Sequence, residues 1–95
     1  MEISNNKNSN EFNMAAEYAK KIIGKRTNDE LKELYGLFKQ ATIGDVNISK
    51  PGLLDFKGRD KWNAWNQKKG LSKHTSEVNY ITLINNLIKK YGINE

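Results

Sequence analysis

Cysteine is absent from this chain of 95 residues, and histidine and proline occur once each, as His74 and Pro51. Without cysteine the chain forms neither disulfide bonds nor cysteine-based metal centres, and a single histidine cannot build a His-rich metal site. No apolar run approaches the roughly 20 residues that a membrane-spanning helix needs. The polar, Asn-rich start of the chain lacks the apolar core of a signal peptide. We therefore expect a cytoplasmic protein that holds no metal.

Basic residues outnumber acidic ones, 16 against 11, which gives a formal net charge of +5. This charge favours an anionic partner: a phosphorylated small molecule, a nucleic acid or an anionic membrane surface. Nucleophilic catalysis needs a base that a third group orients, and the one histidine lies in a polar helix start. The chain also lacks a glycine-rich phosphate-binding motif. We therefore predict a binding protein rather than an enzyme.

Apolar residues recur at helical spacing in four segments, over residues 10–23, 28–42, 58–69 and 73–91. Each segment has a start signal or a stop signal. Ser9 or Asn10 can cap the first, Thr27 and Glu30 form a capping box for the second, and Ser72 can cap the fourth. Gly24, Gly70 and Gly92 follow the ends of the first, third and fourth segments, where left-handed residues are common. The pattern predicts an all-α protein, and no strand pattern or internal repeat is present.

The segment 44–57 contains Gly44, Pro51 and Gly52, which is typical of a long ordered loop. We expect its apolar residues Leu53, Leu54 and Phe56 to pack against the core and anchor the loop. The nearby Trp62 and Trp65 lie three residues apart on one helix face, and core packing is the preferred interpretation for both. In the last helix we expect an apolar stripe made of Val78, Ile81, Ile84, Leu87, Ile88 and Tyr91.

Four blocks of the sequence occur in an order that resembles the acyl-CoA-binding protein family. They read Phe-x-x-Ala-Ala from Phe12, Tyr-Gly-Leu-Phe-Lys-Gln-Ala-Thr from Tyr35, Pro-Gly-x-Leu-Asp-Phe from Pro51, and Lys-Trp-x-Ala-Trp from Lys61. The resemblance covers about residues 9–93. It implies a four-helix bundle in up-down-down-up order, in which the long loop lets the second and third helices run parallel. We expect a disordered polar tail at 1–8 and one acyl-CoA-binding domain at 9–95.

The resemblance also implies a ligand, fatty acyl-CoA, and the residues that contact it. Lysine suits the phosphates of CoA, and the family's ligand-contacting positions correspond here to Lys20, Lys39, Lys57 and Lys61. Family positions used for the nucleotide end correspond to Tyr35 and Tyr80. The remaining predicted contacts lie in the same block as Tyr35: Gly36, Leu37 and Phe38. Phe38 stands where the family often has tyrosine, so a hydroxyl contact is expected to be missing.

The fatty tail needs an apolar groove, because each buried methylene contributes roughly 0.8 kcal/mol. The candidates for its wall are Phe12, Ala15, Ala16 and Leu34, with Leu37 beside them. Three simpler interpretations stay open from the residues alone. The lysines can be solvated surface groups, the tyrosines can be half-buried packing residues, and the alanines can serve to let helices approach closely.

The resemblance implies a non-enzymatic carrier that buffers and transports medium- to long-chain acyl-CoA esters. No cofactor is expected beyond this ligand. We expect a monomer with no nucleic-acid partner, and transient contact with acyl-CoA-using enzymes or membranes is an open alternative. A second function class is a basic helical module that binds nucleic acid or an anionic membrane. The lysines are scattered over all helices rather than gathered in one recognition stripe, which disfavours that class.

Overall fold

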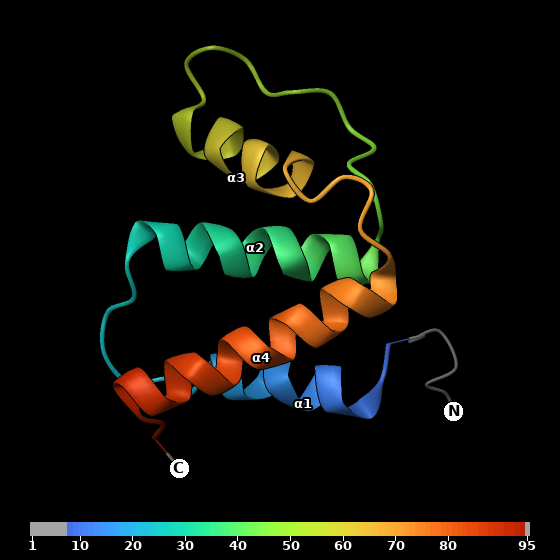
Figure 1. Ribbon diagram of the computed structural model, residues 1–95. Helices are drawn as coiled ribbons and strands as arrows, with labels where there is room; N and C mark the ends of the chain where they lie inside the picture. The colour runs from blue at the N-terminus through green and yellow to red at the C-terminus, as the bar shows by residue number, and fades with distance from the viewer. Residues whose placement is uncertain (1–7, 95) are drawn as a thin grey trace, which may run out of the picture.

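The computed structural model describes residues 8–94 and contains four helices: α1 (Asn10–Ala19), α2 (Asn28–Thr42), α3 (Phe56–Asn66) and α4 (Lys73–Tyr91). Figure 1 shows that α1 and α4 run in one direction and α2 and α3 in the other. The 43–55 loop crosses back along α3, so the parallel order of α2 and α3 needs this long connection. The predicted all-α, up-down-down-up bundle is confirmed.

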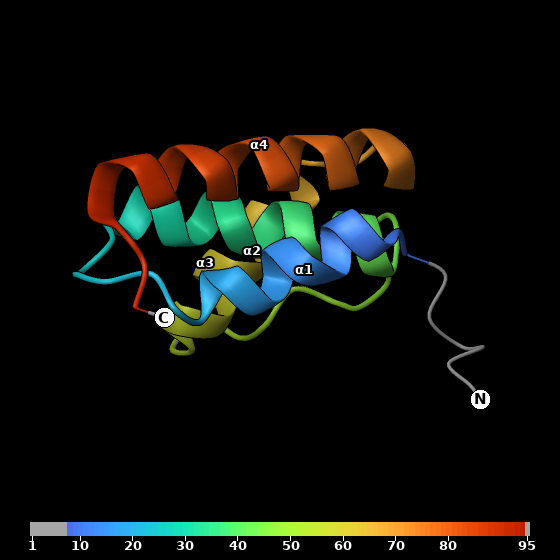
Figure 2. The ribbon, with the colours of Figure 1, turned by 90° about the horizontal axis from the view of Figure 1, so that it is seen from below.

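The helices pack as a chain of neighbours rather than as a square bundle. Contacts between elements connect α1 with α4, α4 with α2, and α2 with α3. Figure 2, seen from the α1 side, shows α1 lying alongside α4, with α3 behind α2. The core therefore lies among α1, α2 and α4, and α3 covers a separate side of α2. The buried apolar residues of this core are Phe12, Ala15, Ile22, Leu37, Ala41, Tyr80, Ile84 and Leu87.

Capping residues set the helix starts. The side chain of Ser9 accepts a hydrogen bond from the N–H of Phe12, and Ser72 caps α4 in the same way. Thr27 and Glu30 form the predicted capping box at the start of α2. The third helix begins earlier than predicted because Asp55 acts as its N-cap, accepting from the N–H of Gly58 at 2.9 Å.

The first helix ends at Ala19, not at residue 23 as predicted. The backbone after it leaves the helix to pair with the C-terminal segment. Ile22 forms an isolated antiparallel bridge with Ile93, and the N–H of Ile23 donates to the carbonyl of Gly92 at 2.9 Å. These intersegment hydrogen bonds replace the helical ones. Gly24 has the expected positive φ of 87°, but it lies in the following connection rather than at the helix end.

The N-terminal end of α1 is fastened to the start of α4. The buried Glu77 side chain accepts from the backbone N–H of Ser9 at 3.0 Å and from the side-chain amide of Asn8 at 2.6 Å. That amide also donates to the carbonyl of Ala41. The predicted tail at 1–8 otherwise lies outside the described residues, so the division into tail and domain stays a prediction. Within residues 8–94, none of the helices has the length and apolarity to cross a bilayer.

The prediction that the loop is anchored by its own apolar residues is wrong. Leu53, Leu54 and Phe56 are 76%, 87% and 71% exposed. The loop is instead held by α3, whose indole N–H groups donate to loop carbonyls: Trp62 to Ile48 at 2.8 Å and Trp65 to Gly44 at 2.7 Å.

Further polar bonds hold the same loop at its beginning, at Asp45, and further along, at Pro51. Arg59 donates to the carbonyl of Pro51 at 3.1 Å. Asp45 accepts hydrogen bonds from the N–H of Gly70 and from the buried Gln40 side chain, and these bonds lower the pKa of Asp45. Because these bonds are made by polar groups, the apolar loop residues are left free to face solvent.

Two other burial predictions need correction. Val78, predicted to belong to the apolar stripe of the fourth helix, is largely exposed. Ile23, the last residue of the predicted first helical segment, is also exposed because that helix has already ended. Trp65 is buried as predicted, whereas Trp62 is only half-buried and serves the loop.

Candidate ligand-binding site

A cleft of about 410 Å³ lies between the first half of α2 and the start of α3. We call it the α2–α3 cleft and define it by its lining residues: Asn28, Leu31, Lys32, Tyr35, Lys57, Asp60 and Lys61. Helical periodicity brings these side chains together. On α2 they lie three or four residues apart, and Lys57, Asp60 and Lys61 repeat the same spacing on α3. Parallel helices then place the two rows opposite each other.

Cations lie over aromatic rings at this helix pair. The Nζ of Lys61 lies 5.7 Å from the ring centre of Tyr35, and the Nζ of Lys39 lies 4.9 Å from that of Trp65. Both distances are within the range of a cation–π interaction, which positions an ammonium group without neutralising its charge. The lysines are thereby held at the α2–α3 interface and remain able to meet an anion.

The α2–α3 cleft carries net positive charge, because three lysines line it against the single carboxylate of Asp60. A second cleft of about 350 Å³ lies further along the same helix pair and is different in character. Its lining includes the carboxylates of Asp29, Glu33 and Asp60 and only one lysine. A phosphate would be repelled there and attracted in the α2–α3 cleft. Charge therefore favours the α2–α3 cleft over the second cleft as the candidate anion site.

A separate aromatic cluster joins α1, α2 and α4. The ring of Phe12 lies 5.0 Å from that of Tyr80 and 5.7 Å from that of Phe38, and Phe38 lies 5.9 Å from Tyr80. Phe12 and Tyr80 are 1% and 4% exposed, whereas Phe38 reaches the surface. Burial raises the pKa of the Tyr80 hydroxyl because the phenolate would be desolvated. Tyr80 is therefore a neutral ring in this cluster and not a lining residue of the α2–α3 cleft.

The remaining predicted site residues occupy three kinds of place. Gly36 and Leu37 are buried in α2, and Gly36 faces the backbone of Ala64 so closely that a Cβ would lie 2.5 Å from its carbonyl oxygen. Lys20 ends α1 and pairs with Glu17 at 3.4 Å on the surface. The groove candidates Ala15, Ala16 and Leu34 pack in or against the core, as Phe12 does.

Sequence reasoning missed four residues of the α2–α3 cleft: Asn28, Leu31, Lys32 and Asp60. Leu31 is exposed and forms the apolar wall of the cleft. The available signal was its position four residues before Tyr35, on the same face. Asp60 lies three residues after Lys57, a spacing that places both side chains on one face of α3.

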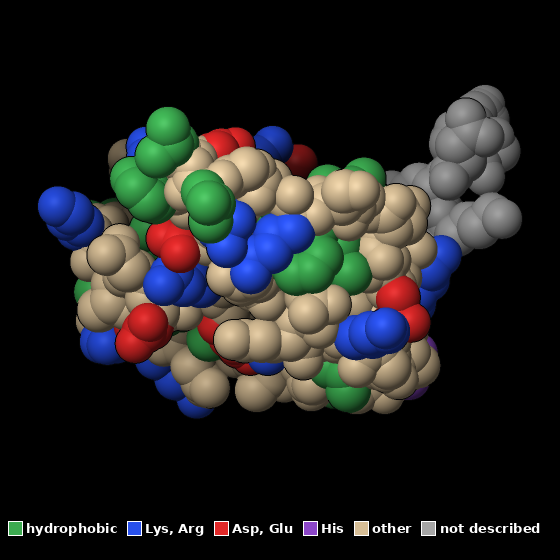
Figure 3. Space-filling view, turned by 90° about the horizontal axis from the view of Figure 1, so that it is seen from above, with side chains coloured by type: hydrophobic (Ala, Val, Ile, Leu, Met, Phe, Trp, Pro, Cys, Tyr) green, Lys and Arg blue, Asp and Glu red, His purple; other side chains and the backbone are tan. Residues whose placement is uncertain are grey.

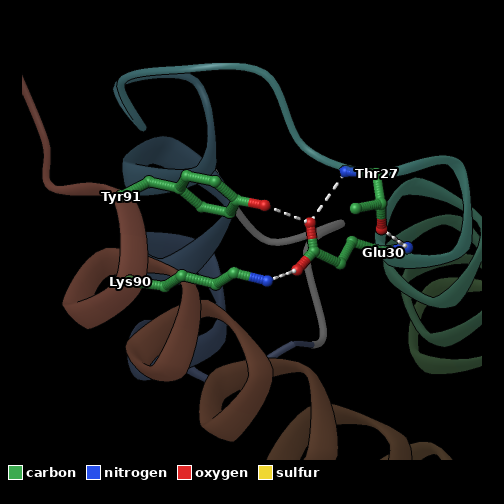
Figure 4. Close-up of polar contacts among 4 residues, drawn as sticks. All are labelled: Thr27, Glu30, Lys90 and Tyr91. Atoms are coloured by element: carbon green, nitrogen blue, oxygen red, sulfur yellow. Dashed lines mark hydrogen bonds and ion pairs between the residues drawn. The ribbon is translucent and has the colours of Figure 1, made fainter.

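A polar cluster fixes the start of α2, which carries the α2–α3 cleft. In Figure 4 the carboxylate of Glu30 faces three donors at once. One oxygen accepts from the N–H of Thr27 at 2.8 Å and from the hydroxyl of Tyr91 at 2.7 Å, and the other accepts from Lys90 at 2.8 Å. Hydrogen bonding by Lys90, then by Thr27 and Tyr91, lowers the pKa of Glu30 to about 2. The cluster ties Glu30, at the start of α2, to the end of α4. Glu30 directly precedes Leu31, which lines the α2–α3 cleft.

Metal chemistry has no support in the described part of the chain. Among residues 8–94 there is no group of three or more histidine or carboxylate side chains placed to hold a metal ion. The single histidine, His74, is exposed in the first turn of α4. The arrangement around the α2–α3 cleft is suited to binding an anion beside an aromatic ring.

Known proteins are similar to this chain in sequence and in fold. A family model described as "Acyl CoA binding protein" matches residues 9–84. The chain is 48% identical over 84 residues to the acyl-CoA-binding protein homolog of Drosophila melanogaster, a match that covers 88% of this chain and 98% of that protein. It is also 48% identical over 81 residues to acyl-CoA-binding protein homolog 1 of Caenorhabditis elegans, covering 85% and 94%. The crystal structure of acyl-CoA-binding protein 2 from Oryza sativa superposes with a TM-score of 0.82 at 40% identity, covering 84% of this chain and 89% of that one.

Proposed function

Since this chain belongs to the acyl-CoA-binding protein family, we propose that it binds fatty acyl-CoA thioesters and carries them without catalysing a reaction. The observation that carries the proposal is the composition of the α2–α3 cleft. It presents the ring of Tyr35, the apolar side chain of Leu31 and two lysines of α3 within one concave surface. These are the groups that a ligand with an adenine, phosphates and a fatty tail requires.

The proposed roles follow from charge and shape. Lys57 and Lys61 meet phosphate oxygens, and Lys39, held over Trp65, extends the positive surface along α2. Tyr35 supplies a flat ring. A lysine that contacts a phosphate forms a charge-assisted hydrogen bond, which is stronger than a neutral one.

We also propose that Tyr80 contacts the nucleotide end and that the groove candidates contact the fatty tail, and both roles require a change in the structure. Phe12, Ala15 and Tyr80 are buried without a ligand, so nucleotide or fatty-tail contacts there require the aromatic cluster to open. Phe38 is the exposed member of this cluster and would move first. Lys20, at the end of α1, is proposed to reach a phosphate from outside the α2–α3 cleft.

The carrier function that we propose is to buffer medium- to long-chain acyl-CoA esters in the cytoplasm as a monomer. Sequestration would protect the thioester from water and shield membranes from a detergent-like compound. Handing over such cargo would require transient contact with membranes or with enzymes that use it.

Lys61→Ala tests the proposed site. We expect a loss of roughly 1.5–3 kcal/mol in binding free energy, which is about ten- to a hundredfold in Kd, because a contact between an ammonium group and phosphate is removed. Isothermal titration calorimetry with a long-chain acyl-CoA measures it. The matched control is Lys89→Ala, which removes another exposed lysine, from the last turn of α4. Equal affinities of the Lys61 variant and the wild type would remove Lys61 from the site.

A further inference from the structure

The most exposed apolar side chains of the described chain are concentrated at one place. Leu53, Leu54 and Phe56 lie within four residues of one another, and each is more than 70% exposed. Figure 3 views the face that carries α3 and the 43–55 loop, and apolar side chains protrude at one end of it beside Lys and Arg side chains. We call Leu53, Leu54 and Phe56 the loop tip. Exposed apolar groups gathered in this way mark an interaction site more often than scattered ones do.

The exposure of the loop tip is built into the fold. Polar bonds hold the loop on both sides of it. Arg59 donates to the Pro51 carbonyl, the N–H of Asp55 donates to the Gly52 carbonyl, and the Asp55 side chain accepts from the N–H of Gly58. The backbone therefore has a defined course that presents the leucines outward. These bonds use backbone and polar groups, so they hold this part of the loop without burying the three apolar side chains.

Charge around the loop tip is positive. Lys50 lies three residues before it, with its Nζ 5.6 Å from the Trp62 ring centre, and Lys57 follows it directly. Both lysines are exposed. Asp55, the carboxylate between Leu54 and Phe56, is engaged as the N-cap of α3. Apolar side chains that project between lysines suit a surface that is anionic outside and apolar just beneath.

We propose that the loop tip docks on an anionic lipid bilayer, with Leu53, Leu54 and Phe56 entering the interface and Lys50 attracting the headgroups. A bilayer fits this feature because exposed lysines flank the apolar side chains, which matches a surface with anionic headgroups over an apolar layer. The use of this docking, to transfer cargo at a membrane, rests on the proposed carrier function. Lys57 adjoins the loop tip and lines the α2–α3 cleft, so docking brings the cleft against the membrane, where an amphipathic cargo can leave or enter.

The test is co-sedimentation of ligand-free protein with vesicles of 70% phosphatidylcholine and 30% phosphatidylserine, repeated with pure phosphatidylcholine. The loop variant is Leu53→Asn with Leu54→Asn. We expect its partition coefficient to fall at least about tenfold, because apolar insertion contributes energy for each buried methylene. Lys50→Gln should lower it by about fivefold on anionic vesicles only. The matched control is Met14→Asn with Val78→Asn, which removes two exposed apolar residues from α1 and α4 and should partition as the wild type does.

Three outcomes decide the proposal. Lost vesicle binding by the loop variant, with its acyl-CoA affinity unchanged, supports it. Equal partitioning of the loop variant and the wild type overturns it. A concentration-dependent dimer in analytical ultracentrifugation that the loop variant abolishes also overturns it, because the loop tip would then bind a second copy. Vesicle binding is measured without acyl-CoA, so a failure of the carrier proposal appears separately, as wild-type protein that does not bind acyl-CoA.

Discussion

Gly36→Ala probes the contact on which the α2–α3 cleft depends. Gly36 lies in the middle of α2, where alanine is ordinarily the better helix former by roughly 0.5–1 kcal/mol. Its α-carbon faces α3 so closely that an added Cβ would lie 2.5 Å from the carbonyl oxygen of Ala64 and 3.0 Å from the carbonyl carbon. Both atoms belong to backbone inside a helix, so neither can rotate away.

The helices would have to separate until the contact between the new Cβ and the Ala64 oxygen reached an ordinary length of about 3.4 Å. Overpacking of this kind costs about 1–3 kcal/mol. The gain in helix propensity offsets part of that, so we expect a net loss of about 0.5–2 kcal/mol in the free energy of unfolding. Separation also moves Lys61 away from Tyr35, so acyl-CoA affinity should fall with stability.

Urea unfolding followed by tryptophan fluorescence gives the free energy, because both tryptophans lie on α3. Gly52→Ala is the matched control: a Cβ there would meet no atom within 4 Å, so the same substitution should be neutral or slightly stabilising. A Gly36→Ala protein as stable as the wild type, with unchanged affinity, would refute the idea that close backbone approach sets the α2–α3 spacing.

Two further predictions concern other contacts. The pKa of Glu30 is lowered from 4.5 to about 2, so its ion pair with Lys90 stabilises the fold above pH 4.5, and this contribution is lost as the pH falls towards 2. Glu30→Gln should therefore melt at a lower temperature than the wild type at pH 7, and the difference should shrink in melts at pH 2–3; a difference independent of pH would contradict the ion pair. Trp65→Phe removes the N–H that binds the Gly44 carbonyl and leaves a cavity, so urea unfolding should report a loss of about 2–4 kcal/mol, and a loss below about 1 kcal/mol would argue against this anchor of the loop.

Local signals in the sequence predicted the helices well where a single interaction decides the outcome. The Thr27–Glu30 capping box begins α2 as expected, because both partners are close in sequence and satisfy each other. Gly92 ends α4 with a positive φ for the same kind of local reason. The end of α1 escaped prediction because it depends on Ile93, which is distant in the sequence and pairs with Ile22 only in the fold.

The loop shows a second limit of sequence reasoning. Leu53, Leu54 and Phe56 were assigned to the core because they are apolar, but Trp62 and Trp65 already supply the anchors. Indole N–H bonds to particular carbonyls depend on tertiary geometry, and no spacing rule encodes them.

The candidate site was predictable in part. The resemblance pointed to Tyr35 and Lys61, and helix periodicity would have added Leu31 and Asp60 once the parallel order of α2 and α3 was accepted. The packing of Tyr80 against Phe12 was not predictable, because burial of that ring depends on how α1 meets α4.

Calorimetric titration of the wild-type protein with a long-chain acyl-CoA, with free CoA and with the matching fatty acid tests the central claim most directly. We predict one-to-one binding of acyl-CoA, far tighter than the binding of either fragment, because the cationic cleft and an apolar surface act on the same ligand. Equal affinity for free CoA and acyl-CoA, or no binding of acyl-CoA, would contradict it.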